Sequence, residues 1–484
     1  MSALFGKGAR FLLVLMTLYI VVFGALTALR HYHFLTQTWD LGIYEQTLWN
    51  TVHGRIMQND LEEIPNSLGV HFNVIMFLIL PGFAIFPSPY YLLLLQTIIL
   101  ALGAWPLYLF ARKHLNDVRL AQIVAIGYVL YSPLHWLNWY DFHPVAFVVP
   151  ALLAGIYFLD ERRLWWAALF LGLAASTQEN AILAVMFAGL YAVLMNGTGK
   201  AVTGHNTRWR VWAPGVVVMV VALVYFLLVI EIIMPSLGGG LLRFDRYAHL
   251  GGSLFDIVGN MARHPLLLVR TVASWGKLEY VFWLFLPVVC LPFLEWRALL
   301  LIVPGLLQNM LTTFSPQFSS NYQYDATLIP GMFIGASLGL AMLVRRYPTK
   351  KKMFAWVLCV SILVAFFVRS PIRPLDFRLG FFQSNATREA MEAAVRMVPD
   401  GASVAAHTYF VPHLANRAKI YMLGFEREPV DVLVVDGASA FGFRDGHAFR
   451  SYLEKYMNSG NYVVRRLDDR FAVIVRKDVR LRGE

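Results

Sequence analysis

The segment VWAPGVVVMVVALVYFLLVIEIIM, residues 211–234, carries a single charged side chain, Glu231, which lies near its end. A helix needs about 20 consecutive apolar residues to cross a bilayer. The segment therefore predicts a membrane-spanning helix. It decides the fold class, because a chain built around such segments is expected to be an α-helical polytopic membrane protein.

The same pattern recurs along most of the chain, and eleven segments predict membrane-spanning helices. They lie at residues 11–29, 90–110, 120–137, 144–159, 164–176, 180–195, 211–234, 280–294, 298–311, 327–344 and 353–369. One further apolar segment, FNVIMFLILPGFAIF at residues 72–86, is interrupted by Pro81 and Gly82. We expect it to form a re-entrant or interfacial helix, because a full crossing there would turn the basic segment that follows residue 110 outward.

The overall composition also favours a membrane protein. Hydrophobic residues make up 58% of the 484 residues and charged residues 15%, whereas soluble globular chains carry about 25% charged residues. The two cysteines, Cys290 and Cys359, both lie in apolar segments. A disulfide framework or a cysteine-rich metal site is therefore excluded.

The charged residues are concentrated in the C-terminal part of the chain. Residues 370–484 hold 31 of the 71 charged residues, and Pro371 and Pro374 mark the change in composition. Alternating apolar residues there predict short strands and a terminal hairpin with a turn at Asp468-Asp469, and two segments have helical periodicity. We predict a transmembrane domain at residues 1–369 and a small soluble α/β domain at residues 370–484.

The distribution of Lys and Arg predicts the orientation, since positively charged loops stay in the cytoplasm. With the N-terminus inside and eleven crossings, the inner segments hold 16 Lys and Arg residues, including Arg345 and Lys351, and the outer loops before residue 370 hold fewer. The C-terminal domain is then extracytoplasmic, and the protein is integral to the cytoplasmic membrane. The net charge of +11 is mostly a consequence of this topology, so a nucleic-acid partner is not expected.

Ionisable residues close to the hydrocarbon are costly and therefore mark candidate functional sites. The first predicted outer loop, residues 30–71, contains TWDLGIYEQTLWN at residues 38–50, where Asp40 is followed at helical spacing by Glu45 and Gln46. A partly buried carboxylate beside aromatic rings can act as a general base. An interfacial amphipathic helix with a capping aspartate explains the same pattern equally well.

Two short outer turns and the end of the first loop add further polar residues, which could bind substrate. They are His71, Asp141, His143, Gln178, Glu179 and Asn180. Histidines and carboxylates are also usual metal ligands, so a divalent metal stays an alternative, although no cofactor is firmly implied. Hydrogen-bonding or helix-capping roles around a polar cavity are the simpler explanation.

A second large outer loop, residues 235–279, carries a cluster of cationic side chains that includes Arg243, Arg246 and Lys277. Arginine binds phosphate in a bidentate manner, so the loop suits a lipid phosphate. Simple contact with anionic membrane lipids is the alternative. A last outer loop, TTFSPQFSSNYQYDA at residues 312–326, is rich in hydroxyl, amide and aromatic groups, which suit either carbohydrate or a wet membrane interface.

Several segments together resemble a prokaryotic domain-of-unknown-function family of polytopic membrane proteins that is similar to GT-C glycosyltransferases. They are WDLGIYEQTLWN, His71-Phe72, the DFHP motif at 141–144, the QEN turn at 178–180 and VPDGASVAAHTYFVPHLANRAKIYML at 398–423. The resemblance implies an inverting transferase with a polyprenyl-phosphate-linked sugar donor. It also implies a catalytic aspartate early in the first outer loop, where Asp40 is the matching residue. The first outer loop has no Asp-Glu or Asp-x-Asp pair, which leaves the metal requirement open.

The sequence therefore predicts a membrane glycosyltransferase acting on the extracytoplasmic side, on a lipid, glycan or protein acceptor. In this hypothesis Asp40 is the base, the polar turns shape the pocket, and Arg243, Arg246 and Lys277 hold the lipid phosphate. A transporter or flippase of a lipid-linked or small polar substrate is one alternative, although no internal repeat of the kind typical of transporters is visible. A non-catalytic envelope assembly protein is the other.

Overall fold

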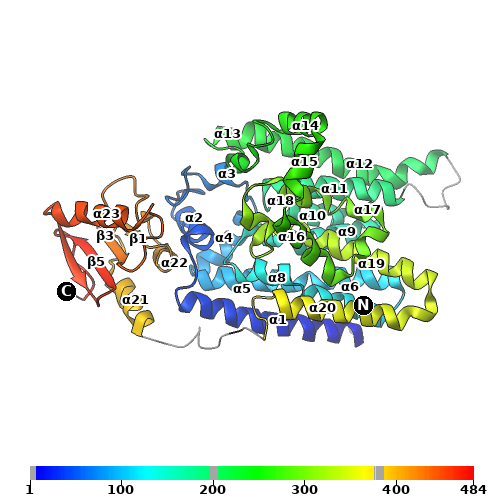
Figure 1. Ribbon diagram of the computed structural model, residues 1–484, viewed down its shortest axis with the longest axis horizontal. Coiled ribbons are helices and arrows are strands. Elements are labelled where there is room, and N and C mark those ends of the chain that lie inside the picture. The colour runs from blue at the N-terminus through cyan, green and yellow to red at the C-terminus, as the bar shows by residue number, and fades with distance from the viewer. Residues whose placement is uncertain (1–6, 197–204, 375–376, 378–385, 484) are drawn as a thin grey trace.

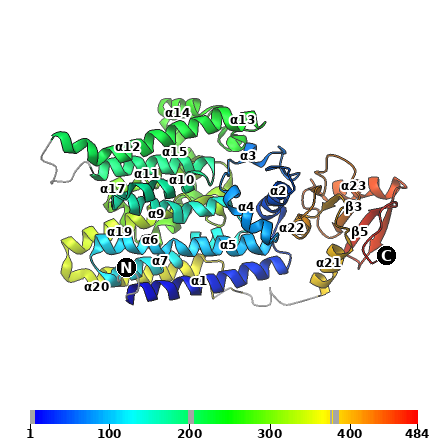
Figure 2. The ribbon, with the colours of Figure 1, turned by 180° about the vertical axis from the view of Figure 1, so that it is seen from behind.

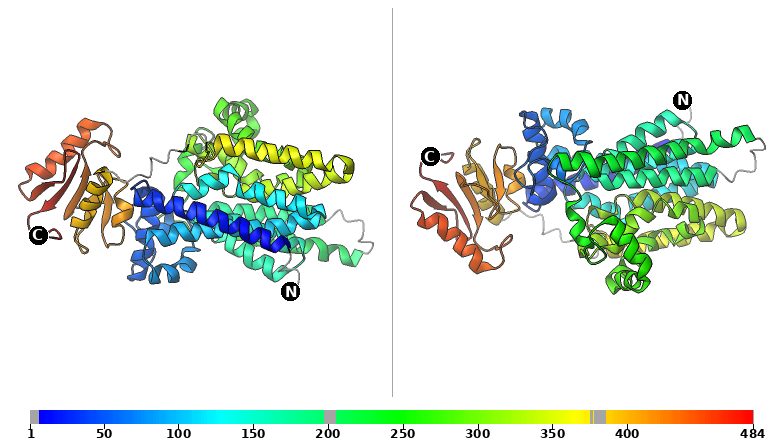
Figure 3. Two further views of the ribbon diagram at one scale, coloured as in Figure 1. Left: turned by 90° about the horizontal axis from the view of Figure 1, so that it is seen from below. Right: turned by 90° about the horizontal axis from the view of Figure 1, so that it is seen from above.

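The computed structural model describes residues 7–196, 205–374, 377 and 386–483. A bundle of apolar helices forms its larger part, and a small mixed α/β domain lies beyond one end of the bundle in every view (Figures 1 and 2). We call residues 386–483 the C-terminal domain. The first described helix begins near the opposite end of the bundle, as the views from below and above also show (Figure 3).

The bundle consists of helices that run roughly along its long axis (Figure 1). They are α1 (Lys7–Tyr32), α5 (Pro89–Leu102), α6 (Ala104–Leu115), α7 (Val118–Val129), α8 (Ser132–Trp139), α9 (Val148–Asp160), α10 (Leu164–Ala175), α11 (Glu179–Asn196), α12 (His205–Leu228), α19 (Ile329–Arg346) and α20 (Lys351–Arg369). Within the described residues, six helical stretches are long and apolar enough to cross a membrane, and four shorter apolar helices accompany them. The number of complete crossings stays a prediction.

The peripheral helices expose their apolar side chains. Only 22% of the most apolar stretch in Val211–Ser236 is buried, and only 17% of that in Pro348–Arg369, whereas 72% is buried in Val118–Trp139. A soluble protein rarely leaves apolar surface of this extent uncovered, and helices satisfy their own backbone hydrogen bonds in lipid. The exposed faces of α12 and α20 therefore fit contact with the hydrocarbon of a membrane, and the central helices form the protein core.

Two predicted spans, 280–294 and 298–311, are not continuous helices in the structure. Helix α16 (Trp275–Phe285) gives way to the short turns η6 (Leu286–Val288) and η7 (Leu291–Leu294), followed by α17 (Trp296–Leu299) and α18 (Val303–Leu311). The chain turns at Val289 and Cys290, which both have φ of 52°. Pro287, Pro292 and Pro304 each remove a backbone donor in this region, and proline interrupts a helix interior. Apolar composition alone therefore overestimated helix length here.

Shorter elements connect the bundle helices near the C-terminal domain. The first connection contains η2 (Thr38–Gly42), α2 (Ile43–Val52), α3 (Ser67–Val70) and α4 (Met76–Ile85). The second contains η4 (Val229–Ile233), α13 (Met234–Ser236), η5 (Leu242–Tyr247), α14 (Leu254–Arg263) and α15 (Pro265–Val272), and others are η3 (Pro144–Phe147), η8 (Ser315–Phe318) and η9 (Gln323–Asp325). A further short turn, η10 (Pro348–Lys350), joins α19 to α20 at the other end of the bundle. Helix α4 falls within the segment predicted to be re-entrant. Its 10 residues rise only about 15 Å, half the hydrocarbon thickness.

The far end of the bundle collects the loops predicted to be cytoplasmic. Lys113 contacts both Asp160 and Glu161 at 2.7 Å, Lys351 pairs with Asp117, and Arg345 donates to the backbone oxygen of His114. These contacts join three interhelical connections that the Lys and Arg distribution places on one side of the membrane. The structure therefore groups the loops as the topology requires, while the assignment of the sides stays a prediction.

The C-terminal domain contains a five-stranded sheet in the order β2-β1-β3-β5-β4. Strands β1 (Val404–Ala406), β2 (Ile420–Met422) and β3 (Val432–Asp436) are parallel, and β5 (Phe471–Arg476) is antiparallel to both β3 and β4 (Tyr462–Arg466). Val432 and Val434 share a core with α21 (Ala386–Met397), while Leu433 and Val435 share one with α23 (Gly446–Asn458). This alternation is the period of two that a strand buried on both faces requires. The strands and the terminal hairpin that the sequence predicts are confirmed.

Candidate active site in the loops near the C-terminal domain

A cavity of about 420 Å³ lies among the loops that connect the bundle helices. Its size falls within the range of small-molecule sites. Apolar side chains from α11, α12 and α18 contribute to its wall, and polar side chains come from the connections that follow α1, α8, α10, α12 and α18. The residues predicted from sequence that line it are Asp40, His71, His143, Gln178, Glu179, Asn180, Arg243 and Arg246.

Asp40 reaches the cavity from a strained turn between α1 and α2. Its φ of 80° and ψ of −87° lie near the γ-turn region that non-glycine residues seldom adopt. The Ile43 N–H donates to the Asp40 carbonyl, and α2 begins at that residue. Backbone conformations of this kind persist only where the surroundings hold them, and they concentrate at functional sites.

His143 approaches Asp40 from a different part of the bundle. Its Nε2 lies 2.9 Å from Oδ1 of Asp40, and its side chain is 2% exposed, against 19% for Asp40. The ring of Tyr140 stacks on the imidazole with centroids 5.8 Å apart. A buried imidazole in contact with a partly exposed carboxylate is an arrangement that general acid–base chemistry uses.

Gln96 of α5 fixes the turn that carries His143. Its Oε1 accepts from the backbone N–H of His143 at 2.7 Å, and its Nε2 donates to the backbone oxygen of Asp141, also at 2.7 Å. Gln96 is fully buried. One amide therefore satisfies both ends of the three-residue turn, in which Asp141 has a φ of 54°.

Asp141 is buried beneath the cavity and does not line it. Its Oδ2 accepts from the backbone N–H of Gln37 at 2.8 Å, and Oδ1 lies 3.5 Å from Nη2 of Arg30. Burial raises the pKa of Asp141 to about 6, although the Arg30 guanidinium opposes this shift. The side chain anchors the chain three residues before Asp40, so its contacts are with protein groups rather than with the cavity.

His71 and Glu179 form a second polar pair in the cavity wall. His71 Nδ1 donates to Glu179 Oε1 at 3.0 Å, and the backbone N–H of Phe72 donates to Oε2, also at 3.0 Å. Burial alone would lower the pKa of His71, but the Glu179 carboxylate outweighs it and the pKa is raised. Gln178 Nε2 lies 3.1 Å from the same His71 nitrogen, so the first loop is held against the start of α11.

The cationic residues of the cavity come from η5. Arg243 makes a bidentate contact with Glu63, at 2.9 and 3.1 Å, and the two side chains are 41% and 57% exposed. The Arg246 guanidinium lies 4.1 Å from the centroid of the Phe314 ring, and its Nη1 donates to Oε1 of Gln317 at 3.3 Å. Two guanidinium groups therefore border the cavity, and neither is buried in an ion pair.

The family of predicted membrane proteins DUF2079 matches residues 30–473, which is most of the chain. The chain belongs to the DUF2079 family. No curated protein matches it.

Solved structures show which fold the DUF2079 chain has. ArnT from Cupriavidus metallidurans bound to undecaprenyl phosphate is similar, with a TM-score of 0.53 and 12% identity over 96% of this chain and 97% of that one. ArnT from the same organism in the apo state gives a TM-score of 0.49 and 12% identity over 95% and 98%. The first comparison shows that the DUF2079 chain has the GT-C glycosyltransferase-like fold that the sequence resemblance implied.

Besides Asp141, three predicted residues of the DUF2079 chain lie outside the cavity. Gln46 and Asp60 exchange two hydrogen bonds, from Gln46 Nε2 to Asp60 Oδ2 at 2.8 Å and from the Asp60 N–H to Gln46 Oε1 at 2.9 Å. Glu45 is 1% exposed, and burial raises its pKa well above the usual value. Lys277 donates to the backbone oxygen of Thr271 at 2.7 Å and is 4% exposed.

These three placements have physical reasons. Glu45 and Gln46 were placed by helical spacing from Asp40, but the turn at Asp40 is not helical and rotates α2 relative to it. Lys277 bonds to the last turn of α15 and lies over the ring of Phe318 in η8. The structure therefore does not bring them together with Asp40.

Other cavity residues of the DUF2079 chain were not singled out. Gln308 accepts from Asn180 Nδ2 at 3.2 Å, and Tyr44, Gln317, Gln323 and Tyr324 also line the wall. The hydroxyl- and amide-rich composition of residues 312–326 was the available signal for three of them. No grouping of three or more His, Cys, Asp or Glu side chains suited to a metal ion occurs in the part of the chain that the structure describes.

Proposed function

We propose that this DUF2079 protein is an integral membrane glycosyltransferase. It transfers a sugar from a polyprenyl-phosphate-linked donor to a lipid, glycan or protein acceptor on the extracytoplasmic side. The observation that carries the proposal is the composition of the cavity, where the Asp40–His143 pair and the guanidinium groups of Arg243 and Arg246 border one space. The GT-C-like fold supports it, because the similar ArnT structure is described as bound to undecaprenyl phosphate.

In the proposed reaction, Asp40 accepts the proton of an acceptor hydroxyl as that oxygen attacks the anomeric carbon. The bond from that carbon to the phosphate oxygen breaks, and its electron pair leaves with the polyprenyl phosphate. Attack from the face opposite the leaving group inverts the anomeric configuration. His143 holds the carboxylate in one orientation, since its Nε2 contacts Oδ1. A positioned general base contributes about 10² to 10⁴-fold to a rate.

Arg243 and Arg246 are the groups proposed to bind the phosphate. Guanidinium groups stabilise the negative charge that develops on a leaving phosphate. The Glu63 partner of Arg243 is largely exposed, so exchanging it for a phosphate oxygen requires little desolvation. Glu179, His71 and Asn180 are proposed to hydrogen-bond the sugar, because carboxylates, imidazoles and amides are suitable partners for its hydroxyl groups.

The test uses purified protein reconstituted into vesicles with a panel of radiolabelled polyprenyl-phosphate sugars and membrane extracts as acceptor. Asp40→Asn is expected to lower transfer by about 10² to 10⁴-fold while binding of polyprenyl phosphate stays at the wild-type level. Asp245→Asn is the matched control, because Asp245 is exposed in η5 and does not line the cavity. Full transfer by Asp40→Asn contradicts the assignment of the base, and donor binding by the wild type without turnover favours the transporter or assembly alternative.

A further inference from the structure

The C-terminal domain contacts the bundle at the turn that carries Asp40. The Thr38 N–H donates to Oγ1 of Thr408 at 3.1 Å, and Oγ1 of Thr38 donates to the backbone oxygen of Thr408, also at 3.1 Å. Thr38 is 0% and Thr408 3% exposed. Thr38 begins η2, two residues before Asp40, so these two hydrogen bonds, both donated by Thr38, fix one end of the turn.

The other end of the turn meets the same domain. Gly42 ends η2, and a Cβ atom added there would lie 3.0 Å from Cγ1 of Val411, closer than ordinary van der Waals contact. Val411 begins α22 (Val411–Leu414). Both ends of the Asp40 turn therefore lie against one short segment, Thr408 to Val411. A turn in a sparsely populated conformation needs this kind of support from its surroundings.

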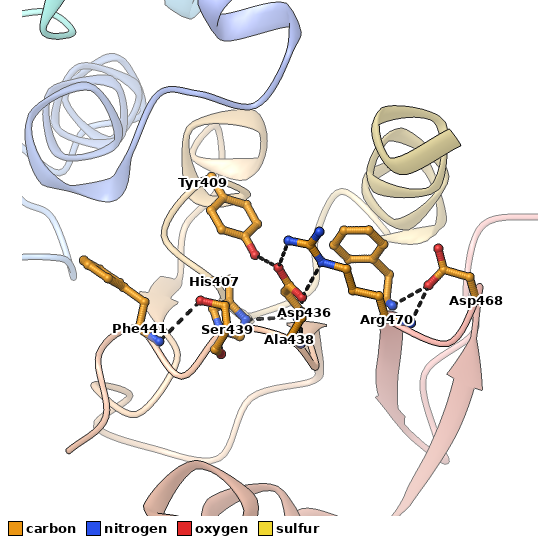
Figure 4. A network of polar contacts seen from close by, with 9 residues as sticks. His407, Tyr409, Asp436, Ala438, Ser439, Phe441, Asp468 and Arg470 are labelled. Atoms are coloured by element: carbon orange, nitrogen blue, oxygen red, sulfur yellow. Dashed lines mark hydrogen bonds and ion pairs between the residues drawn. The ribbon is translucent and has the colours of Figure 1, made fainter. Parts of the chain in front are cut away.

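The residues before and after Thr408, His407 and Tyr409, are both held by the sheet (Figure 4). Asp436 ends β3 and is fully buried. Its carboxylate accepts from Nε and Nη2 of Arg470, at 2.8 and 2.6 Å, and from the hydroxyl of Tyr409. The Asp436 N–H donates to Nδ1 of His407 at 3.0 Å. The two neighbours of Thr408 are thus both bonded to the end of β3, and the Thr408 side chain is held toward the bundle.

We infer that Thr408 is a positioning residue for Asp40: the C-terminal domain holds the Asp40 turn in the conformation that directs the carboxylate to His143. The claim that this support matters for catalysis rests on the proposed function, whereas the claim that Thr408 holds the turn does not. Support of the Asp40 turn is a role that a lid or a partner-binding module would not have. Loss of the hydrogen bonds between Thr38 and Thr408 should make the turn more mobile, while the polar side chains of the cavity stay in place.

The first experiment measures hydrogen–deuterium exchange in the purified full-length protein. Thr408→Val keeps the side-chain shape but removes the acceptor of the Thr38 N–H, and a hydrogen bond of ordinary strength corresponds to about fivefold faster exchange when it is lost. We expect this increase in the peptides that cover residues 38–43. Thr408→Ser, which keeps the hydroxyl, should restore the wild-type rate.

A matched control separates this effect from general weakening of the interface. Asn416→Ala removes another hydrogen bond between the two domains, from Asn416 Nδ2 to the backbone oxygen of Pro87, and should leave exchange at residues 38–43 unchanged. Should Thr408→Val fail to accumulate, Gly42→Ala probes the same contact, since its φ of −62° accepts alanine while the added methyl presses on Val411. Wild-type exchange at residues 38–43 in both Thr408→Val and Gly42→Ala would overturn the inference.

The second experiment uses the vesicle transfer assay. Thr408→Val should lower kcat about tenfold or more while KM for the lipid-linked donor stays unchanged, and Thr408→Ser should rescue kcat. A rise in KM with unchanged kcat would contradict a positioning role. The two proposals can fail separately. Full activity of Asp40→Asn would remove Asp40 as the base, but the exchange experiment would still decide whether Thr408 holds the turn.

Discussion

Oδ1 of Asp40 lies 2.9 Å from Nε2 of His143, although one residue follows α1 and the other follows α8. The imidazole is buried and the carboxylate is partly exposed, so His143 lies on the buried side of the carboxylate. Three hydrogen-bonded contacts support the two segments that carry this pair: Gln96 bonds to the His143 N–H, Asp141 accepts from the Gln37 N–H, and Thr408 accepts from the Thr38 N–H.

Replacing His143 by Ala should lower sugar transfer about 10²-fold, because small errors in the placement of a reacting group have effects of this order. Binding of polyprenyl phosphate should stay at the wild-type level, since the phosphate contacts are assigned to other side chains. Single-turnover rates in vesicles measure the first effect and equilibrium binding the second. His53→Ala, a change at an exposed histidine in the connection that carries Asp40, should have no effect, and equal activity of the two variants would remove His143 from the site.

Gln96→Leu should destabilise the protein and lower transfer together. The substitution leaves the backbone N–H of His143 and the backbone oxygen of Asp141 buried without their partner, and each such group costs about 1–3 kcal/mol. Thermal unfolding in detergent should therefore show a clear fall in the midpoint. Gln96→Glu keeps the acceptor for the His143 N–H and should lose less stability than Gln96→Leu; the reverse order would show that the turn is anchored in another way.

Arg243→Ala should raise KM for the lipid-linked donor about tenfold and also lower kcat, because the guanidinium is proposed to stabilise the leaving phosphate as its charge develops, while thermal stability stays nearly unchanged. Its pair with Glu63 is largely exposed, and exposed ion pairs contribute at most about 1 kcal/mol to stability. Glu63→Gln is the matched variant, because it removes the charge partner but leaves the guanidinium free to bind phosphate. A similar rise in KM in Glu63→Gln would assign the effect to the ion pair rather than to phosphate binding.

Hydropathy predicted the bundle where long apolar segments exist. The segment at 211–234 and that at 353–369 are helices with exposed apolar faces, because lipid contact leaves a strong signal in composition. The same reasoning failed at 280–294, where Pro287 and Pro292 divide an apolar segment that is buried by protein rather than by lipid alone. Apolar composition reports burial, and it does not report whether the backbone stays helical.

The grouping of polar residues in the cavity was predictable for a related reason. Short polar turns between apolar helices must lie at the ends of the bundle, so His71, His143 and Glu179 share one end once the topology is right. The conformation of Asp40 was not predictable, because Asp, unlike Gly, gives no signal for a φ of 80°. The contact between Thr38 and Thr408 was equally invisible, since two ordinary threonines far apart in the chain carry no motif.

His413 lies in the contact between the two domains, and we expect it to make this contact depend on pH. Its ring stacks on His31, with centroids 4.0 Å apart, and on Phe34 at 3.8 Å. Burial, assisted by the neighbouring His31, holds the pKa of His413 well below its usual value of 6.5. The folded state therefore favours the neutral ring, and its stabilising contribution is complete above pH 6.5 and is lost as the pH falls below that value.

Acidification from pH 7.5 to 5 should therefore lower the thermal unfolding midpoint of the wild type more than that of His413→Phe. Phenylalanine keeps the stacking on Phe34 and cannot take up a proton, so part of the pH dependence disappears; His31 faces the same contact, and His31→Phe combined with His413→Phe should flatten the dependence further. His447→Phe, a change at an exposed histidine of α23, should behave as the wild type. An identical loss of stability on acidification in the wild type and the double variant would show that protonation of this stacked pair does not weaken the interface.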